Sequence, residues 1–215
     1  MFSLLKKNTA FFIPYLLFLL IGGIILIVYS KVDIALFING YHCNAADFFF
    51  QYWTGIGLGY LVIPVTLFLA FKSMRYAIMS LITFILTVSI NNSIKFWARL
   101  PRPEIVFQGM HKQIYYVPGV DIYSSNSFPS GHSAISFGLF CLLALTMQKP
   151  LHKFLMFMIA FLVAYSRMYL AEHFLMDVYA ASVIGIVCTL VTFTLVTNWK
   201  WLNKFAATDK PLLRL

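Results

Sequence analysis

The amino-acid sequence predicts an all-α, polytopic membrane protein with six transmembrane helices. Of its 215 residues, 61% are hydrophobic and only 11% are charged, and the mean hydropathy is +0.83. Apolar stretches close to the roughly 20 residues that cross a bilayer recur along the chain. A hydropathy window places the expected spans at about Phe11 to Tyr29, Gly55 to Phe71, Tyr76 to Phe96, Ser133 to Met147, Phe154 to Leu170 and Val178 to Thr197. The fourth span is the shortest.

The first apolar run follows Lys6 and Lys7, as in a signal peptide. The run is long, however, and no clear small-residue cleavage site follows it, so we expect it to be retained as the first span. No linker, low-complexity stretch or internal repeat divides the sequence. We therefore expect residues 1–215 to form one integral-membrane domain, with the functional motifs between Lys95 and Asp177.

The distribution of charge predicts the orientation. With six spans, both termini lie on one side, and ten of the sixteen basic residues belong to that side: Lys6, Lys7, Lys72, Arg75, Lys149, Lys153, Lys200, Lys204, Lys210 and Arg214. Its one acid is Asp209, whereas the opposite side carries six bases and six acids. By the positive-inside rule the termini are cytoplasmic. The polar segments between the spans then face outward.

Composition argues against two other classes of protein. The net charge of +9 could suggest nucleic-acid binding, but the excess flanks the spans, where topology and anionic headgroups account for it. Cys141 and Cys188 lie in apolar runs, and only Cys43 is in an outer segment, so no disulfide framework is indicated. No cysteine and histidine spacing typical of a zinc site occurs. We expect neither a nucleic-acid partner nor a metal.

The outer segment from Lys31 to Trp53 mixes aromatic and polar residues, which is typical of an interfacial anchor or lid. Gly55, Gly57 and Gly59 follow at a spacing of two. A helix would not place them on one face, so we expect a flexible entry into the second span.

Three short polar segments interrupt the apolar background, and charge in such surroundings is costly unless it is paired or functional. The first contains Lys95 and Arg102. Pro101 and Pro103 hold Arg102 in an extended segment. An ammonium and a guanidinium together suit the several oxygens of a phosphate. The alternative is that Lys95 merely extends to the membrane surface.

The second polar segment, Pro129 to His132, immediately precedes the fourth apolar run. Ser130 is a good helix N-cap, Gly131 leaves room for a ligand, and the first N–H groups of a helix bind anions. An ordinary serine cap followed by a structural His132 is the alternative interpretation.

The third polar segment runs from Ser166 to Asp177 and includes Arg167. His173 and Asp177 are four residues apart, hence on one face of a helix. A carboxylate bonded to one ring nitrogen fixes the tautomer and raises the basicity of the other nitrogen. Such a histidine can be a base, a metal ligand or a nucleophile. No second cluster of acids supplies a metal site, so we favour the nucleophile.

In this order and spacing, the three polar segments resemble the signature of the type-2 phosphatidic acid phosphatase superfamily. Its members are lipid phosphate phosphatases that share a core with vanadium haloperoxidases and glucose-6-phosphatase. The match is close from about Lys95 to Asp177 and rests on hydropathy elsewhere. Family members often have a second Arg-Pro pair where this chain has Leu100-Pro101. Arg99 is a candidate replacement for that phosphate contact.

The resemblance implies that His173 attacks phosphorus to give a phosphohistidine and that Asp177 orients it. His132 would protonate the leaving oxygen and then activate the hydrolytic water. The residues that would hold the phosphoryl oxygens are Lys95, Arg102, Ser130, Gly131 and Arg167. No metal or other cofactor is implied.

We therefore expect a membrane lipid phosphatase with its active site at the outer membrane interface. Its short length and outward site resemble bacterial inner-membrane members that act on undecaprenyl pyrophosphate, phosphatidylglycerol phosphate or lipid A phosphates. One alternative is a phosphotransferase that passes the phosphoryl group to another acceptor. Another is a non-catalytic lipid carrier or channel, with which Asn91 and Asn92 near Lys95 are compatible. No protein partner is evident.

Polar residues without a role in the three motifs are expected to select the headgroup or to face solvent and the membrane interface. The outer loop between Phe107 and Phe128 is predicted to help select the lipid headgroup, through Lys112, Tyr115, Tyr116, Asp121 and Tyr123. Glu104 and Glu172 lie beside the basic cluster in the sequence, where they could tune its pKa values or repel doubly charged headgroups; the simpler expectation is that they are solvated acids. Three histidines outside the motifs are expected to be solvated or interfacial: His42, His111 and His152.

Overall fold

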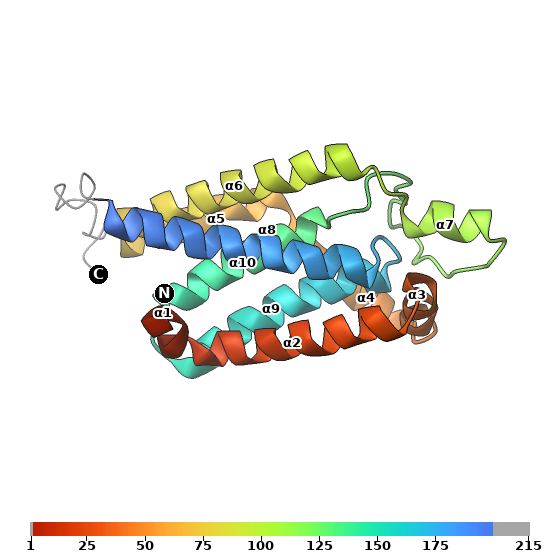
Figure 1. Ribbon diagram of the computed structural model, residues 1–215, viewed down its shortest axis with the longest axis horizontal. Helices are drawn as coiled ribbons and strands as arrows, with labels where there is room; N and C mark the ends of the chain where they lie inside the picture. Colours follow the sequence, from red (N-terminus) through yellow and green to blue (C-terminus); the bar gives the residue numbers. More distant parts are fainter. Residues whose placement is uncertain (1, 200–215) are drawn as a thin grey trace.

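The computed structural model describes residues 2–199, and every regular element in that range is a helix (Figure 1). The basic residues predicted for the C-terminal tail, Lys200, Lys204, Lys210 and Arg214, lie outside the described residues, as does Asp209.

The long helices run side by side along the long axis of the molecule (Figure 1). They are α2 (Thr9–Val28), α5 (Val62–Lys72), α6 (Met74–Ala98), α8 (Gly131–Thr146), α9 (Pro150–Tyr169) and α10 (Leu175–Asn198). The short helix α1 (Phe2–Lys7) and the end of α10 lie at one end of the bundle. The other end carries α3 (Lys31–Asn39), α4 (Asn44–Trp53), α7 (Pro103–Gly109) and the loop that follows α7.

Each predicted apolar run contains a helix, and the prediction of an integral membrane protein is confirmed. Among the described residues, α2, α6, α9 and α10 belong to segments long and apolar enough to cross a bilayer. The segment from Asn44 to Lys72 reaches that length only as a pair of helical pieces bent by 57°. Helix α8 has 16 residues, and twelve of them are buried. The count of six spans stays a prediction.

The bend between α4 and α5 falls on the glycines for which we predicted a flexible entry. Two short 3₁₀ helices occupy this corner, η1 (Thr54–Gly57) and η2 (Gly59–Leu61). Gly57 has a steric role there, because a Cβ on it would lie 2.7 Å from Val163 and 2.8 Å from the Cβ of His132. A glycine is therefore required where η1 passes over the start of α8.

Helix α8 forms the centre of the bundle, packed against α6, α9 and α10. Its closest approach is to α10, where a Cβ on Gly185 would lie 2.3 Å from the backbone oxygen of Ala134. The Thr189 hydroxyl donates a hydrogen bond to the backbone oxygen of Gly138 at 2.8 Å. Small residues that bring two backbones together and a hydroxyl that bridges them are typical of helix pairs in membranes. This contact fixes the first half of α8 against the middle of α10.

Buried polar side chains tie the outer cap to the bundle. The Asp47 carboxylate of α4 accepts hydrogen bonds from the hydroxyls of Tyr169, at 2.5 Å, and Tyr115, at 2.7 Å. Asn39 of α3 bonds both the N–H and the C=O of Tyr115. The ring of His42 stacks on that of Tyr115 at 3.9 Å. The predicted interfacial segment is thus joined both to the outer loop and to the last residue of α9.

Candidate active site

His173 and Asp177 lie where α9 turns back into α10. Asp177 is in the first turn of α10, and its Oδ2 is 3.3 Å from Nδ1 of His173. The same oxygen accepts a hydrogen bond from the backbone N–H of Phe174 at 3.0 Å. The backbone oxygen of Arg167 accepts from the N–H groups of both Glu172 and His173, which closes the turn. The carboxylate can therefore hold the proton on Nδ1 and leave Nε2 with its lone pair.

Ser127 is a member of this site that the sequence did not indicate. Its hydroxyl donates to Oδ2 of Asp177 at 2.5 Å and lies 3.5 Å from Nδ1 of His173. The side chain is 1% exposed. Three donors thus converge on one carboxylate oxygen, which restrains the orientation of Asp177.

Burial lowers the pKa of His173 to about 3, and the positive charges of Arg167 and Arg102 act in the same direction, against the hydrogen bond to Asp177. The imidazole is therefore neutral at physiological pH. A neutral ring with its proton held on Nδ1 is the form that can act as a nucleophile through Nε2.

Arg102 and Arg167 come together through Glu172. The Arg102 guanidinium bonds the Glu172 carboxylate and lies over the ring of Tyr123 at 5.0 Å. Nη2 of Arg167 is 3.3 Å from the same carboxylate oxygen. Nε of Arg167 is buried and has no hydrogen-bond partner among the described residues. A buried cationic N–H group of this kind is well suited to an anionic ligand.

The expectation that Glu172 is a solvated acid is wrong. Its side chain is 3% exposed, because the turn after α9 places it between the guanidiniums of Arg102 and Arg167, which are also buried. Glu104 differs, since it lies on α7 and its carboxylate accepts only a 3.3 Å bond from Gln108 among the bonds described.

The start of α8 supplies the second predicted motif. Ser130 is the N-cap, and its Oγ accepts from the backbone N–H of Ser133 at 3.5 Å and from the Ser133 hydroxyl at 3.0 Å. Within the described structure, a Cβ on Gly131 would meet only Nδ2 of Asn91, at 3.9 Å. An approaching ligand therefore has room beside the first N–H groups of α8.

His132 occupies the first turn of α8, under Gly57. It interacts electrostatically with Arg167, His173, Arg102 and Lys95. The three predicted motifs therefore converge at one end of the bundle, although Lys95 and Asp177 are far apart in the sequence.

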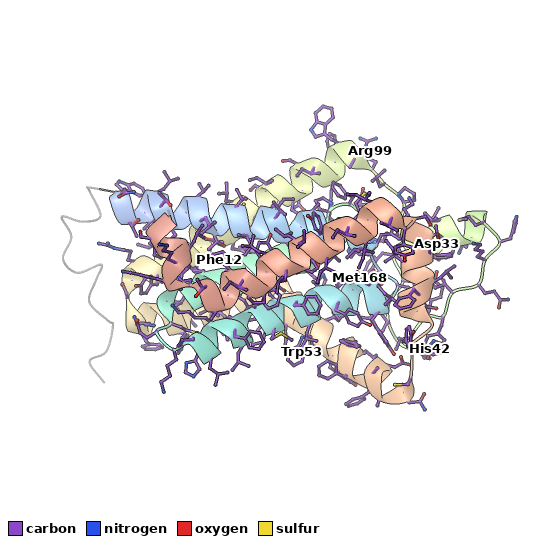
Figure 2. All side chains as sticks on the ribbon, turned by 60° about the horizontal axis from the view of Figure 1, so that its bottom comes forward. Phe12, Asp33, His42, Trp53, Arg99 and Met168 are labelled. Carbon is purple, nitrogen blue, oxygen red and sulfur yellow. The ribbon has the colours of Figure 1, made fainter. Side chains whose placement is uncertain are left out.

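Lys95 and Arg99 differ in their position relative to the polar centre. Lys95, in the last turn of α6, donates to the backbone oxygen of Asn126 at 2.9 Å and interacts with the charges of Arg102 and Asp177. Arg99 is exposed on the outside of that helix end, with its guanidinium 5.0 Å above the ring of Phe96 (Figure 2). Nε of Arg99 donates to the backbone oxygen of Phe96 at 3.0 Å, and the suggestion that Arg99 adds a phosphate contact stays a prediction.

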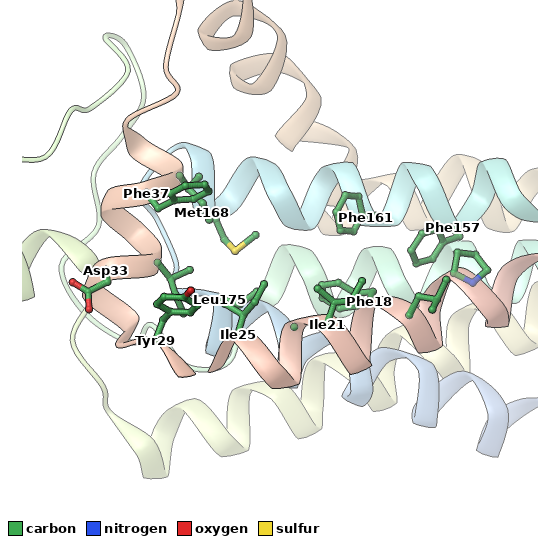
Figure 3. A pocket seen from close by; sticks show the side chains of 15 residues that line it. Phe18, Ile21, Ile25, Tyr29, Asp33, Phe37, Phe157, Phe161, Met168 and Leu175 are labelled. Atoms are coloured by element: carbon green, nitrogen blue, oxygen red, sulfur yellow. The ribbon is translucent and has the colours of Figure 1, made fainter. Parts of the chain in front are cut away.

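A large apolar cleft is separate from this polar centre. It has a volume of about 790 Å³ and lies between α2, α3 and α9 (Figure 3). Side chains such as Phe18, Ile25 and Phe161 line it, with Asp33 at one end. None of the predicted site residues lines this cleft. The cleft offers a surface for hydrocarbon, whereas the predicted site residues lie at the ends of α6, α8, α9 and α10.

A helical membrane bundle that gathers two histidines, one aspartate and three cations at one end defines a membrane protein suited to phosphoryl chemistry. The PAP2 superfamily matches residues 72–201, and the chain belongs to this family. The predicted membership among the PAP2-type membrane lipid phosphatases is thereby confirmed.

Two solved structures resemble the chain. The crystal structure of Aquifex aeolicus LpxE matches with a TM-score of 0.70 and 26% identity, over 78% of this chain and 97% of that one. The PAP2-type phosphatidylglycerolphosphate phosphatase from Bacillus subtilis matches with a TM-score of 0.58 and 21% identity, over 90% and 97%. At that identity the second likeness shows the fold alone. No curated protein is similar enough to match the chain.

Proposed function

We propose that this protein hydrolyses a phosphomonoester or pyrophosphate on a membrane lipid, without a metal, through a phosphohistidine intermediate. The observation that carries the proposal is the position of His173. Its Nδ1 faces the Asp177 carboxylate, and it lies among Arg102, Arg167 and the start of α8.

In the first step, Nε2 of His173 attacks phosphorus while the bond from phosphorus to the lipid oxygen breaks. His132, entering this step protonated, transfers its proton to the leaving oxygen. The imidazole of His173 gains positive character as the N–P bond forms, and Asp177 stabilises that charge. For a pyrophosphate lipid, the leaving group is the lipid monophosphate.

In the second step, water attacks the phosphohistidine. His132, now neutral, takes a proton from this water, and the N–P bond breaks to return His173 and release inorganic phosphate. Splitting one displacement into two is the general advantage of covalent catalysis. His132 thereby regains the proton that it needs for the next turnover.

The charge on the phosphoryl oxygens is stabilised by cations and backbone donors. Arg167 offers its unpartnered Nε, Arg102 a second guanidinium and Lys95 an ammonium, while Gly131 leaves space for contact with the first turn of α8. Ser130 contributes by capping that turn.

The candidate substrates are undecaprenyl pyrophosphate, phosphatidylglycerol phosphate and lipid A phosphates. We place the protein in a bacterial inner membrane, with cytoplasmic termini and the active site facing the periplasm or exterior. Tyr123, which stacks on Arg102, supports a role for the outer loop in selecting the headgroup. Replacing residues 112–123 by a loop from another family member should change the relative rates on these lipids; unchanged ratios would refute this role.

The proposal is tested by phosphate release from detergent-purified protein on those three lipids and phosphatidic acid, with chelator present. We expect His173→Ala to abolish turnover and to leave the melting temperature intact. His152→Ala is the matched control, because His152 is exposed on α9. Activity that persists in His173→Ala, or that requires added metal, would contradict the mechanism. Transfer of phosphate to an added alcohol without release would favour the phosphotransferase, and a folded protein that moves lipid without releasing phosphate would favour the carrier.

A further inference from the structure

Glu172 is a buried carboxylate for which the proposed reaction has no chemical step. One of its oxygens contacts Nη1 of Arg102 and also lies 3.3 Å from Nη2 of Arg167. Nη1 of Arg102 additionally donates to the backbone oxygen of Glu172 at 3.3 Å. A single side chain therefore bridges the two guanidiniums that face the phosphate.

The two arginines have other anchors as well. Nε of Arg102 donates to the backbone oxygen of Ser125 at 2.9 Å, and Nη1 of Arg167 donates to the Thr54 hydroxyl at 2.7 Å. These bonds do not involve Glu172, so they would continue to hold the guanidiniums if its charge were removed. The main effect of Glu172 on the site is then electrostatic.

The contacts of Glu172 with two guanidiniums favour its ionised form. Burial raises the pKa of its carboxyl group, and the charges of Arg167 and Arg102 oppose that rise. Apart from the two histidines, the polar centre contains three positive side chains, Lys95, Arg102 and Arg167, and two carboxylates, Glu172 and Asp177. By formal counting of these five groups, Glu172 lowers the net charge that a phosphate dianion meets from about +2 to about +1.

We propose that Glu172 is a positioning residue that lowers the affinity of the two arginines for phosphate, so that the product leaves readily. The inference rests on the proposed function, which makes phosphate the product. A carboxylate on the edges of both guanidiniums weakens their field at the bound phosphate, and it holds them together between turnovers. The cost is weaker ground-state binding of the phosphoryl group.

The test measures binding of inorganic orthophosphate to the full-length, detergent-purified protein by titration calorimetry. We expect Glu172→Gln to bind orthophosphate at least about tenfold more tightly than the wild type, because one unit charge close to the ligand is removed in partly desolvated surroundings. Glu104→Gln is the matched control and should bind as the wild type does. Glu172→Asp keeps the charge and should stay within about threefold of the wild type, by the same electrostatic reasoning.

The sign of the effect separates this role from a merely structural one. If Glu172 served only to hold the arginines in place, Glu172→Gln would weaken binding, and weakened or unchanged binding would overturn the proposal. If neither the wild type nor Glu172→Gln bound orthophosphate, the proposal would be overturned too. If Glu172→Gln lacks a melting transition, the test rests on Glu172→Asp, which keeps the charge. Orthophosphate binding about tenfold tighter in Glu172→Asp than in the wild type would show that the charge of Glu172 does not set the affinity. Lipid hydrolysis is assayed in parallel: tighter phosphate binding in a protein that hydrolyses no lipid would refute the proposed function and leave this inference standing.

Discussion

Replacing Asp177 by asparagine removes one charge and keeps nearly the same shape. Oδ2 of Asp177 accepts from Ser127, Phe174 and His173, so all three donors point at one position. An asparagine will turn its carbonyl oxygen toward them, because its amide N–H groups would face other donors. The Nδ1 tautomer of His173 is then retained, and the loss is limited to the charge.

The magnitude follows from the 3.3 Å separation of His173 and Asp177. Two unit charges at that distance attract by about 5 kcal/mol at an effective dielectric constant of about 20. The imidazole carries only part of its charge in the transition state, so we take about half, roughly 2.5 kcal/mol, which corresponds to about a 100-fold lower kcat/KM. Asp177→Ala removes the acceptor altogether and should be slower still, by at least about another tenfold.

The assay is phosphate release from the lipid on which the wild type is most active, with the melting temperature in detergent as a check on folding. Asp33→Asn is the matched control, because Asp33 is exposed on α3 and bonds only Ser30 among the described contacts. If folded Asp177→Asn protein kept a kcat/KM within about threefold of the wild type, the reasoning would be refuted, since losing a charge that stabilises the imidazolium should lower kcat/KM by more than that.

Three further outcomes are expected. Because the folded state holds His173 with a pKa of about 3 and the unfolded state near 6.5, the unfolded state takes up the proton first as the pH falls. The wild type should therefore lose about 1.6 kcal/mol of stability relative to His173→Gln between pH 6.5 and pH 5, measured by melting temperature. Gly57→Ala should displace His132 and so lower kcat, while its melting temperature stays close to that of the wild type. Gly185→Ala should destabilise the protein by about 1–3 kcal/mol, since its Cβ would meet the Ala134 backbone oxygen at 2.3 Å.

Each outcome has a contrary result. A stability difference between the wild type and His173→Gln that stays constant with pH would mean that burial does not hold the ring neutral. Gly109→Ala is the control for the glycine substitutions, because among the described residues its added Cβ would meet nothing within 4 Å apart from its chain neighbours and the backbone of its own helix. If Gly57→Ala or Gly185→Ala behaved like this control, the close packing described above would be wrong.

The helices could be predicted from the sequence because hydropathy reports burial in lipid directly. All the apolar runs are helical, and their ends shift by a few residues. The chief difference is the second run, where the helix proper starts at Val62 rather than Gly55. Hydropathy does not encode the 57° bend, which depends on how Gly57 packs against His132. It also misses α3 and α7, since these short helices lack a long apolar run.

The candidate site was predicted to the extent that its residues occur in motifs. His173, Asp177, His132 and the cations lie together, although their catalytic roles stay predictions. Ser127 was missed because a serine in a polar loop carries no periodic signal. The contact of Glu172 with the two arginines depends on the turn after α9, which sequence patterns do not specify. The available hint to its burial in the site was its position in the sequence, next to His173 and five residues after Arg167.

The apolar cleft between α2 and α9 has a practical consequence for handling the protein. We expect hydrocarbon chains of the bilayer to cover its lining, which includes Phe18 and Phe161, and so to support α2 along its length. Solubilisation replaces those chains by detergent tails. Tails too short to fill about 790 Å³ will leave the lining partly wetted, so α2 should loosen first in short-chain detergents. Retention of activity after extraction should therefore depend on the length of the detergent tail more than on the detergent headgroup.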